Sequence, residues 1–373
     1  DFMIYVVKNG DTLEKISNET QIPVTKIISD NQLIYSDRLV PGQALLLLGE
    51  GETGGLGDGL IIGGYAYPFV DPPVLEEALT ALSEMFVFSY GFTFEGDLVP
   101  PPQDEQWMLD RTISAGAAPW MVLTPFSSEG AFNNQLIKVL VENRELQDKL
   151  IRQMVDTVQE KGYEGVDIDF EYILPENREQ YAMFAGRVRE KMNEYGCRVT
   201  VAVAPKSSNR QRGILVEGVD YALLGQNADA VFLMTYEWGY TYGPPMAVAP
   251  FDKVREVVEY AVTQIQPGQL ILGIPNYGYD WTLPYERGIT RARSIGNTEA
   301  VEIASENGAS IEYAQISQSP WFTYRKNGME HIVWFEDVRS ITAKWELIRE
   351  FGLSGARYWN LMRPFRANWL LVG

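Results

Sequence analysis

Eight short apolar segments alternate with helical stretches between residues 60 and 361, and this alternation constrains the fold more than any other feature. The segments expected to form strands are 60–68, 85–92, 118–126, 165–171, 198–205, 230–237, 270–281 and 352–361. Strands separated by helices predict parallel pairing through right-handed crossovers. Eight such units in roughly 310 residues favour an α/β fold of the (β/α)8 barrel type. The alternative is an open doubly wound sheet, although no glycine-rich nucleotide-binding loop follows the first segment.

Residues 1–48 form a separate unit with the order strand, helix, helix, strand. Asp11 or Thr12 is suited to cap the first helix, and Pro41-Gly42 predicts a turn before the last strand. The pattern, with "GDTLEKIS", Asn31 and "LVPGQ", resembles the LysM module. The resemblance implies a partner glycan that contains N-acetylglucosamine. The alternative is a small αβ domain that only packs on its neighbour.

The segment after this unit, 49–59, contains six glycines and three acids, with Leu56 as its one large apolar residue, which predicts a flexible linker. The main domain is then expected over 60–373. The interval before its last strand is too long for one helix, and it predicts a small inserted α+β lobe at about 283–337.

The fourth expected strand contains three acids at alternate positions, in "GVDIDFE". Side chains alternate along a strand, so Asp167, Asp169 and Glu171 share one face, while the apolar residues between them face the helices. In a parallel barrel that face is the interior, and Glu171 lies nearest the mouth. Buried like charges raise one another's pKa, which can keep a glutamic acid protonated for general acid catalysis. The alternatives are a solvated outer face or a divalent metal site.

Four segments together carry a family resemblance. "EGVDIDFE" resembles the signature of glycoside hydrolase family 18, and "MTYEW" at 234–238 resembles that family's sixth-strand motif. "LGIPNYGYDW" and "GLSGARYWNL" resemble its last two strands. The resemblance covers residues 60–370. It implies a reaction in which the substrate's own 2-acetamido oxygen attacks the anomeric carbon, since this family departs from the usual carboxylate nucleophile.

The resemblance also implies roles for five residues of this chain. Glu171 would protonate the leaving oxygen and then activate water. Asp169 would orient the acetamido nitrogen and balance its charge, and Asp167 below it could share a proton with Asp169. Tyr236 would donate a hydrogen bond to the acetamido oxygen, and Trp359 would stack under the sugar ring.

The chain departs from the family pattern at two positions. Glu164 stands where the family has its first aspartate, at the start of the strand and far from the sugar. Glu237 follows Tyr236 in place of an aspartate, and it is a candidate for substrate contact. Tyr65, Trp238 and Tyr277 lie near the ends of expected strands and are further candidates, with core packing as their alternative.

Charge and composition limit the partners. The net charge is −19 and the pI about 4.6, which disfavours nucleic acid and anionic membrane surfaces. Cys197 is the sole cysteine, so no internal disulfide forms, and His331 is the sole histidine, so multi-histidine metal sites are excluded. We expect no cofactor and no metal, and we expect a monomer. The N-terminus does not have the pattern of a signal peptide.

The combination of a LysM-like unit with this barrel resembles the spore-germination and cortex-lytic glycosidases of endospore-forming bacteria. It implies cleavage after N-acetylglucosamine in peptidoglycan, at the spore coat, cortex or cell wall. Two alternatives are a hydrolase of chitin or its oligosaccharides and a non-catalytic, lectin-like barrel. The presence of Glu171 with both aspartates favours an enzyme.

Overall fold

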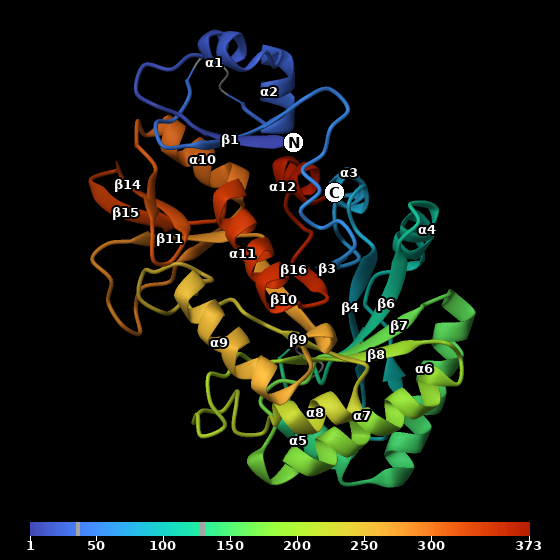
Figure 1. The fold of residues 1–373 in the computed structure, drawn as a ribbon. Helices are drawn as coiled ribbons and strands as arrows, with labels where there is room; N and C mark the ends of the chain where they lie inside the picture. Colours follow the sequence, from blue (N-terminus) through green and yellow to red (C-terminus); the bar gives the residue numbers. More distant parts are fainter. Residues whose placement is uncertain (35–37, 127–130) are drawn as a thin grey trace.

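The computed structural model describes residues 1–34, 38–126 and 131–373, and a closed barrel of eight parallel strands forms its centre (Figure 1). In sequence order these strands are β3 (Ile61–Ala66), β4 (Glu84–Phe92), β6 (Ala118–Leu123), β7 (Gly165–Ile168), β8 (Arg198–Val203), β9 (Ala230–Leu233), β10 (Leu270–Pro275) and β16 (Gly355–Trp359). They pair in the order β3, β16, β10, β9, β8, β7, β6, β4, and β3 also pairs with β4. That last pairing closes the barrel, so the prediction of a (β/α)8 fold is confirmed. A short strand, β5 (Leu98–Val99), pairs antiparallel with the end of β4.

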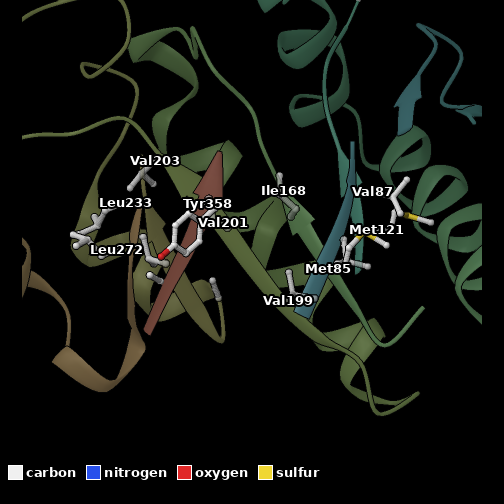
Figure 2. Close-up of a cluster of buried hydrophobic side chains, with 14 of the residues drawn as sticks. Met85, Val87, Met121, Ile168, Val199, Val201, Val203, Leu233, Leu272 and Tyr358 are labelled. Carbon is white, nitrogen blue, oxygen red and sulfur yellow. The ribbon is translucent and has the colours of Figure 1, made fainter. Parts of the chain in front are cut away.

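Helices surround this barrel. They are α3 (Pro72–Leu79), α4 (Gln106–Ser114), α5 (Asn134–Val141), α6 (Arg144–Lys161), α7 (Arg178–Asn193), α8 (Tyr221–Asn227), α9 (Phe251–Gln264), α11 (Val338–Phe351) and α12 (Arg366–Val372), with short 3-10 turns at Pro175–Asn177 and Pro267–Gln269. The outward side chains of the strands pack against the helices in one continuous core, part of which Figure 2 shows with Ile168, Val199 and Leu233. None of the helices in the described ranges has the length and apolar character needed to cross a membrane.

The expected strands and the observed ones differ in length. The segment expected at 165–171 ends as a strand at Ile168, and the one expected at 270–281 divides into β10 and β11 (Gly278–Thr282). β11 leaves the barrel and starts a five-stranded antiparallel sheet. Periodicity could not show this division, because both pieces are almost entirely buried and read as one apolar run.

That sheet and one helix form the inserted lobe. Its further elements are β12 (Arg293–Ile295), α10 (Asn297–Glu306), β13 (Glu312–Ala314), β14 (Ser319–Lys326) and β15 (Met329–Trp334). The sheet has the order β12, β11, β15, β14, β13. Its first strand begins at Gly278, five residues before the expected start of the lobe at about 283. The lobe boundaries stay a prediction.

The N-terminal unit has the expected order of elements, namely β1 (Phe2–Val6), α1 (Leu13–Thr20), α2 (Val24–Asp30) and β2 (Ala44–Leu48). The side chain of Thr12 caps α1 by accepting a hydrogen bond from the Lys15 N–H at 3.1 Å. β1 and β2 pair antiparallel, and Leu13, Ile16 and Ile27 lie in the small core beneath them.

The N-terminal unit is docked on the rest of the chain, beside α10 and α12 (Figure 1). Leu46 and Leu48 of β2 belong to the same buried core as the barrel. The Ile311 N–H donates to the Pro41 carbonyl at 2.8 Å, and a side chain at Gly42 would collide with the Ile311 carbonyl. Arg366 donates from its backbone to Gln32 Oε1 and from its guanidinium to the Ser29 carbonyl, each at 2.8 Å.

The glycine-rich segment 49–59 is attached as well. The N–H groups of Gly54 and Gly57 donate to the carbonyls of Leu370 and Val372 at 2.7 and 2.9 Å. A Cβ at Gly54 would lie 2.2 Å from the Leu371 carbonyl oxygen, so glycine permits a close backbone approach here. The expectation of a freely flexible linker is therefore wrong for this part of it, and the segment holds the N-terminal unit against α12.

Candidate active site

β7 and the three residues after it direct a row of carboxylates from the barrel interior to its mouth. Asp167 lies on β7 and is fully buried, Asp169 is 6% exposed, and Glu171 is partly exposed. Although the strand ends at Ile168, the Asp169 N–H still donates to the Leu123 carbonyl at 2.9 Å, which continues the extended backbone. The predicted common face of the three acids is thus observed, with Glu171 outermost.

Asp167 is held by side chains from three other strands. The Tyr65 hydroxyl donates to its Oδ2 at 2.7 Å, and the Thr200 hydroxyl donates to its Oδ1 at 2.8 Å. Arg357 on β16 places Nη1 3.2 Å from the same Oδ1, and both side chains are fully buried. The expected proton sharing with Asp169 is not what this geometry shows, because Asp167 accepts from three other donors.

Asp169 and Glu171 form the upper pair, joined by a hydrogen bond between their carboxyl groups. Burial, followed by the nearby charges of Glu171 and Asp167, raises the pKa of Asp169 well above its usual range. Burial also raises the pKa of Glu171 to about 7, with a contribution from the charge of Glu237 and an opposing one from the hydrogen bond to Asp169. Two adjacent buried carboxyl groups that cannot both ionise will share one proton near neutral pH.

This pair predicts a pH dependence. The pKa of Glu171 is raised to about 7, so Glu171 holds a proton below that pH and loses it above. If Glu171 is the general acid, kcat/KM on a soluble oligosaccharide should fall as the pH rises through about 7, because that profile reports the free enzyme's groups. A fall that begins near the ordinary glutamate pKa of about 4.3 would contradict the assignment.

Tyr236 and Glu237 follow β9 at the mouth. Burial and the charges of Asp169 and Glu171 raise the pKa of the Tyr236 hydroxyl well above its usual range, which places this hydroxyl close to the upper pair. Glu237 has a left-handed backbone, with φ of 68°, and both of its carboxylate oxygens accept from the Tyr279 hydroxyl, at 3.0 and 2.9 Å. The carboxylate of Glu237 is therefore held by the inserted lobe.

Trp359 ends β16 and lies half-buried among aromatic rings. Its ring centre is 4.8 Å from that of Phe88 and 5.5 Å from that of Tyr65. This position at the mouth suits the predicted floor for a sugar ring. Tyr65 is only 2% exposed and its hydroxyl is bound to Asp167, so the structure places it below the floor.

The two remaining candidates lie in different places. Tyr277 is buried beyond the end of β10, where its ring contacts that of Tyr279 edge to face at 5.6 Å, next to Glu237. Trp238 packs against the core outside the barrel and lines a separate pocket of about 380 Å³ with Gln211 and Ile214. The structure thus brings Tyr277 to the carboxylates and places Trp238 in the outer layer.

Arg357 is the residue that the sequence analysis missed. It lies on the inner face of β16, two positions before Trp359, in the segment "GARYW". An inward arginine could have been inferred from this spacing once Trp359 was assigned to the mouth. Its guanidinium fills the position beside Asp167, which also argues against a metal ion there. No cluster of three or more histidine, cysteine, aspartate or glutamate residues able to hold a metal occurs in the described ranges.

The family follows from comparison with known proteins. Residues 129–363 match the model of glycosyl hydrolases family 18, which is more than half of the chain. The chain belongs to this family. Residues 5–47 match the LysM domain. As a member of glycosyl hydrolases family 18, the chain is a glycoside hydrolase, and its carboxylate row lies where the family signature was recognised.

Individual relatives of this family member cover nearly its whole length. The cortical fragment-lytic enzyme of Bacillus subtilis is 33% identical over 420 residues, which cover 99% of this chain and 97% of that protein. The crystal structure of the Bacillus cereus spore cortex-lytic enzyme SleL superposes with a TM-score of 0.93 at 28% identity, over 100% of this chain and 97% of that one. The crystal structure of SleL from Bacillus megaterium superposes with a TM-score of 0.91 at 30% identity, over 99% of this chain and 96% of that one.

Proposed function

We propose that this chain hydrolyses β-1,4 bonds that follow N-acetylglucosamine in peptidoglycan, in the degradation of spore cortex. The observation that supports this most is the position of the paired Asp169 and Glu171 carboxyl groups at the mouth of a barrel of glycosyl hydrolases family 18. The LysM domain and the names of the cortex-lytic relatives support peptidoglycan as the glycan. The site of action would be the cortex or cell wall, and the working form a monomer.

The geometry supports a reaction that the substrate assists. Asp169 Oδ1 is buried and has no hydrogen-bond partner among the described residues, so it can accept the acetamido N–H of a sugar seated on Trp359. The 2-acetamido oxygen would then attack the anomeric carbon as Glu171 gives its proton to the leaving oxygen. Asp169 would balance the positive charge of the oxazolinium ion, and Tyr236 would bind the acetamido oxygen before attack. Glu171, now a carboxylate, would deprotonate the incoming water.

This mechanism predicts which products appear. The sugar at the cleavage point must carry an N-acetyl group, and an ordinary muramic residue adds a bulky lactyl ether next to that group. Products from spore-cortex peptidoglycan should therefore end in N-acetylglucosamine at the reducing end, identified by mass spectrometry after reduction. Two inversions, first by the internal oxygen and then by water, should release the β anomer first, which NMR detects.

The same assay separates the alternatives. Products that end in a muramic residue, or an α anomer released first, would overturn the proposal. Cleavage of chitin oligomers without cleavage of peptidoglycan would favour the chitinase alternative. Binding of either glycan without any new reducing ends would favour a lectin-like barrel.

A further inference from the structure

Arg357 is a fully buried cation below the upper carboxyl pair, inside the barrel. Its guanidinium carbon lies 4.1 Å from the ring centre of Phe86 and 5.2 Å from that of Phe232, so the aromatic lining of the barrel surrounds it. Rings attract a cation, but they do not replace the water that it loses, and a buried charge of this kind requires an opposite charge. Arg357 can therefore be buried on β16 only because anionic side chains lie next to it.

Asp167 supplies that opposite charge within a closed hydrogen-bond network. Arg357 Nη1 lies 3.2 Å from Asp167 Oδ1 and donates to the Tyr65 hydroxyl at 3.2 Å, while Nη2 donates to the Thr200 hydroxyl at 3.0 Å. Both hydroxyls in turn donate to Asp167, at 2.7 and 2.8 Å. Every donor in this network ends on the one carboxylate, and the geometry suits an ionised Asp167.

We propose that Arg357 is a positioning residue for the reaction, because it neutralises Asp167 and so confines the proton of the active site to Asp169 and Glu171. The inference rests on the proposed function, since it concerns the proton that Glu171 gives to the leaving oxygen. Arg357 itself has no exposed surface and would not contact the sugar.

Other ionisable groups surround Arg357, and their charges support this reading. Glu84 on β4 lies nearby, and within the described part of the chain neither one of its carboxyl oxygens nor Arg357 Nε has a hydrogen-bond partner. Burial raises the pKa of Glu84, and the charges of Arg357 and Arg198 oppose that rise. Further titratable groups interact with Asp167, namely Asp169 above it, Tyr181 on α7 and Tyr236 after β9.

Removal of the cation changes the proton count of the site. Without Arg357, the negative charge of Asp167 is no longer compensated. Asp167, Asp169 and Glu171 together then bind their remaining proton more tightly, because its loss would add a further negative charge to the group. Asp167 also becomes a competing holder of that proton. The fraction of molecules with the proton on Glu171 falls, while the pH at which the last proton leaves rises.

The test compares Arg357→Met, which removes the charge, with Arg357→Lys, which keeps it. For Arg357→Met we expect the alkaline limb of kcat to move up by about one pH unit, since a single charge at this range shifts a pKa by about 1–3 units. We expect kcat at its optimum to fall about tenfold, because a smaller fraction of molecules carries the proton on Glu171. KM should stay within about twofold of the wild-type value, because Arg357 does not contact the substrate. Arg357→Lys should return the limb to its wild-type position, which a purely steric role of the guanidinium would not do.

A second variant addresses folding, because a lone buried Asp167 charge destabilises the barrel. Arg357→Met with Asp167→Asn removes both charges together, and its alkaline limb should lie near that of the wild type even if its kcat stays low. A 13C NMR titration of the glutamate carboxyls, with Glu171 identified through Glu171→Gln, measures the same shift without any turnover. This measurement therefore stands even if peptidoglycan proves not to be the substrate. An unchanged Glu171 titration in folded Arg357→Met, or a limb in Arg357→Lys that moves as far as in Arg357→Met, would overturn the proposal.

Discussion

Replacement of Glu171 by glutamine should lower kcat by about 100-fold or more, because glutamine keeps the shape of the side chain and cannot transfer a proton. Both halves of the proposed reaction depend on this group, as acid toward the leaving oxygen and as base toward water. KM should change little, since the amide preserves most ground-state contacts. The measurement is steady-state kinetics on a soluble peptidoglycan fragment at a pH below about 7, where wild-type Glu171 is protonated.

Glu164 offers a matched control for this prediction. It lies one residue before β7, at the opposite end of the barrel from the mouth, and its side chain is exposed. The substitution Glu164→Gln makes the same chemical change in the same segment and should leave kcat and the unfolding temperature close to wild type. If Glu171→Gln were as active as Glu164→Gln, Glu171 would be removed from the mechanism.

The carboxylate row could be predicted from the sequence because its information is local. Asp167, Asp169 and Glu171 alternate with apolar residues, and a period of two places them on one face whatever the rest of the chain does. The fold could also be predicted, since the spacing of apolar residues within each segment indicates whether it forms a strand or a helix. The strand at this place is shorter than expected, yet the extended backbone continues and the face is kept.

Trp238 shows where the same argument fails. Its position was inferred from the segment 230–237 as a strand, but β9 ends at Leu233 and Glu237 adopts a left-handed backbone. Alternation no longer determines which way a side chain points after such a turn. Glu237 is held at the mouth by a hydrogen bond from the Tyr279 hydroxyl of the inserted lobe, and no local sequence pattern predicts this contact.

The role of Arg357 and the attachment of the glycine-rich segment could not be predicted for a different reason, because both depend on partners that are distant in the sequence. Arg357 is paired with a carboxylate 190 residues earlier in the chain, and on its own an arginine in a strand suggests an exposed edge. Glycines at 49–59 suggest flexibility, whereas Gly54 and Gly57 permit close contact with α12. The consequence is practical, since deletion of the LysM domain would remove Leu46 and Leu48 from the shared core and expose the apolar residues of the barrel domain that they cover.

Replacement of Asp169 by asparagine is expected to have the second large effect, a fall in kcat of about 100-fold, because it removes the anion that balances the oxazolinium charge. It should also move the alkaline limb of activity to lower pH. In the wild type, loss of the proton from Glu171 creates two adjacent anions, and with asparagine it creates one, so the proton leaves more easily. Asp148→Asn, an exposed position on α6, is the control and should change neither quantity.

A thiazoline mimic of the oxazolinium ion distinguishes the role of Asp169 from that of Glu171. The mimic resembles a state that the site stabilises, so it should bind the wild type more tightly than a neutral disaccharide does. Asp169→Asn should weaken this binding by about tenfold or more, since the buried oxygen that faces the ring nitrogen loses its charge. Glu171→Gln should bind the mimic nearly as well as the wild type, because Glu171 acts on the leaving oxygen and on water, neither of which the mimic contains. Equal loss in both variants would mean that Asp169 acts only through its hydrogen bond to Glu171, and equal retention would mean that the charge of Asp169 plays no part in holding the intermediate.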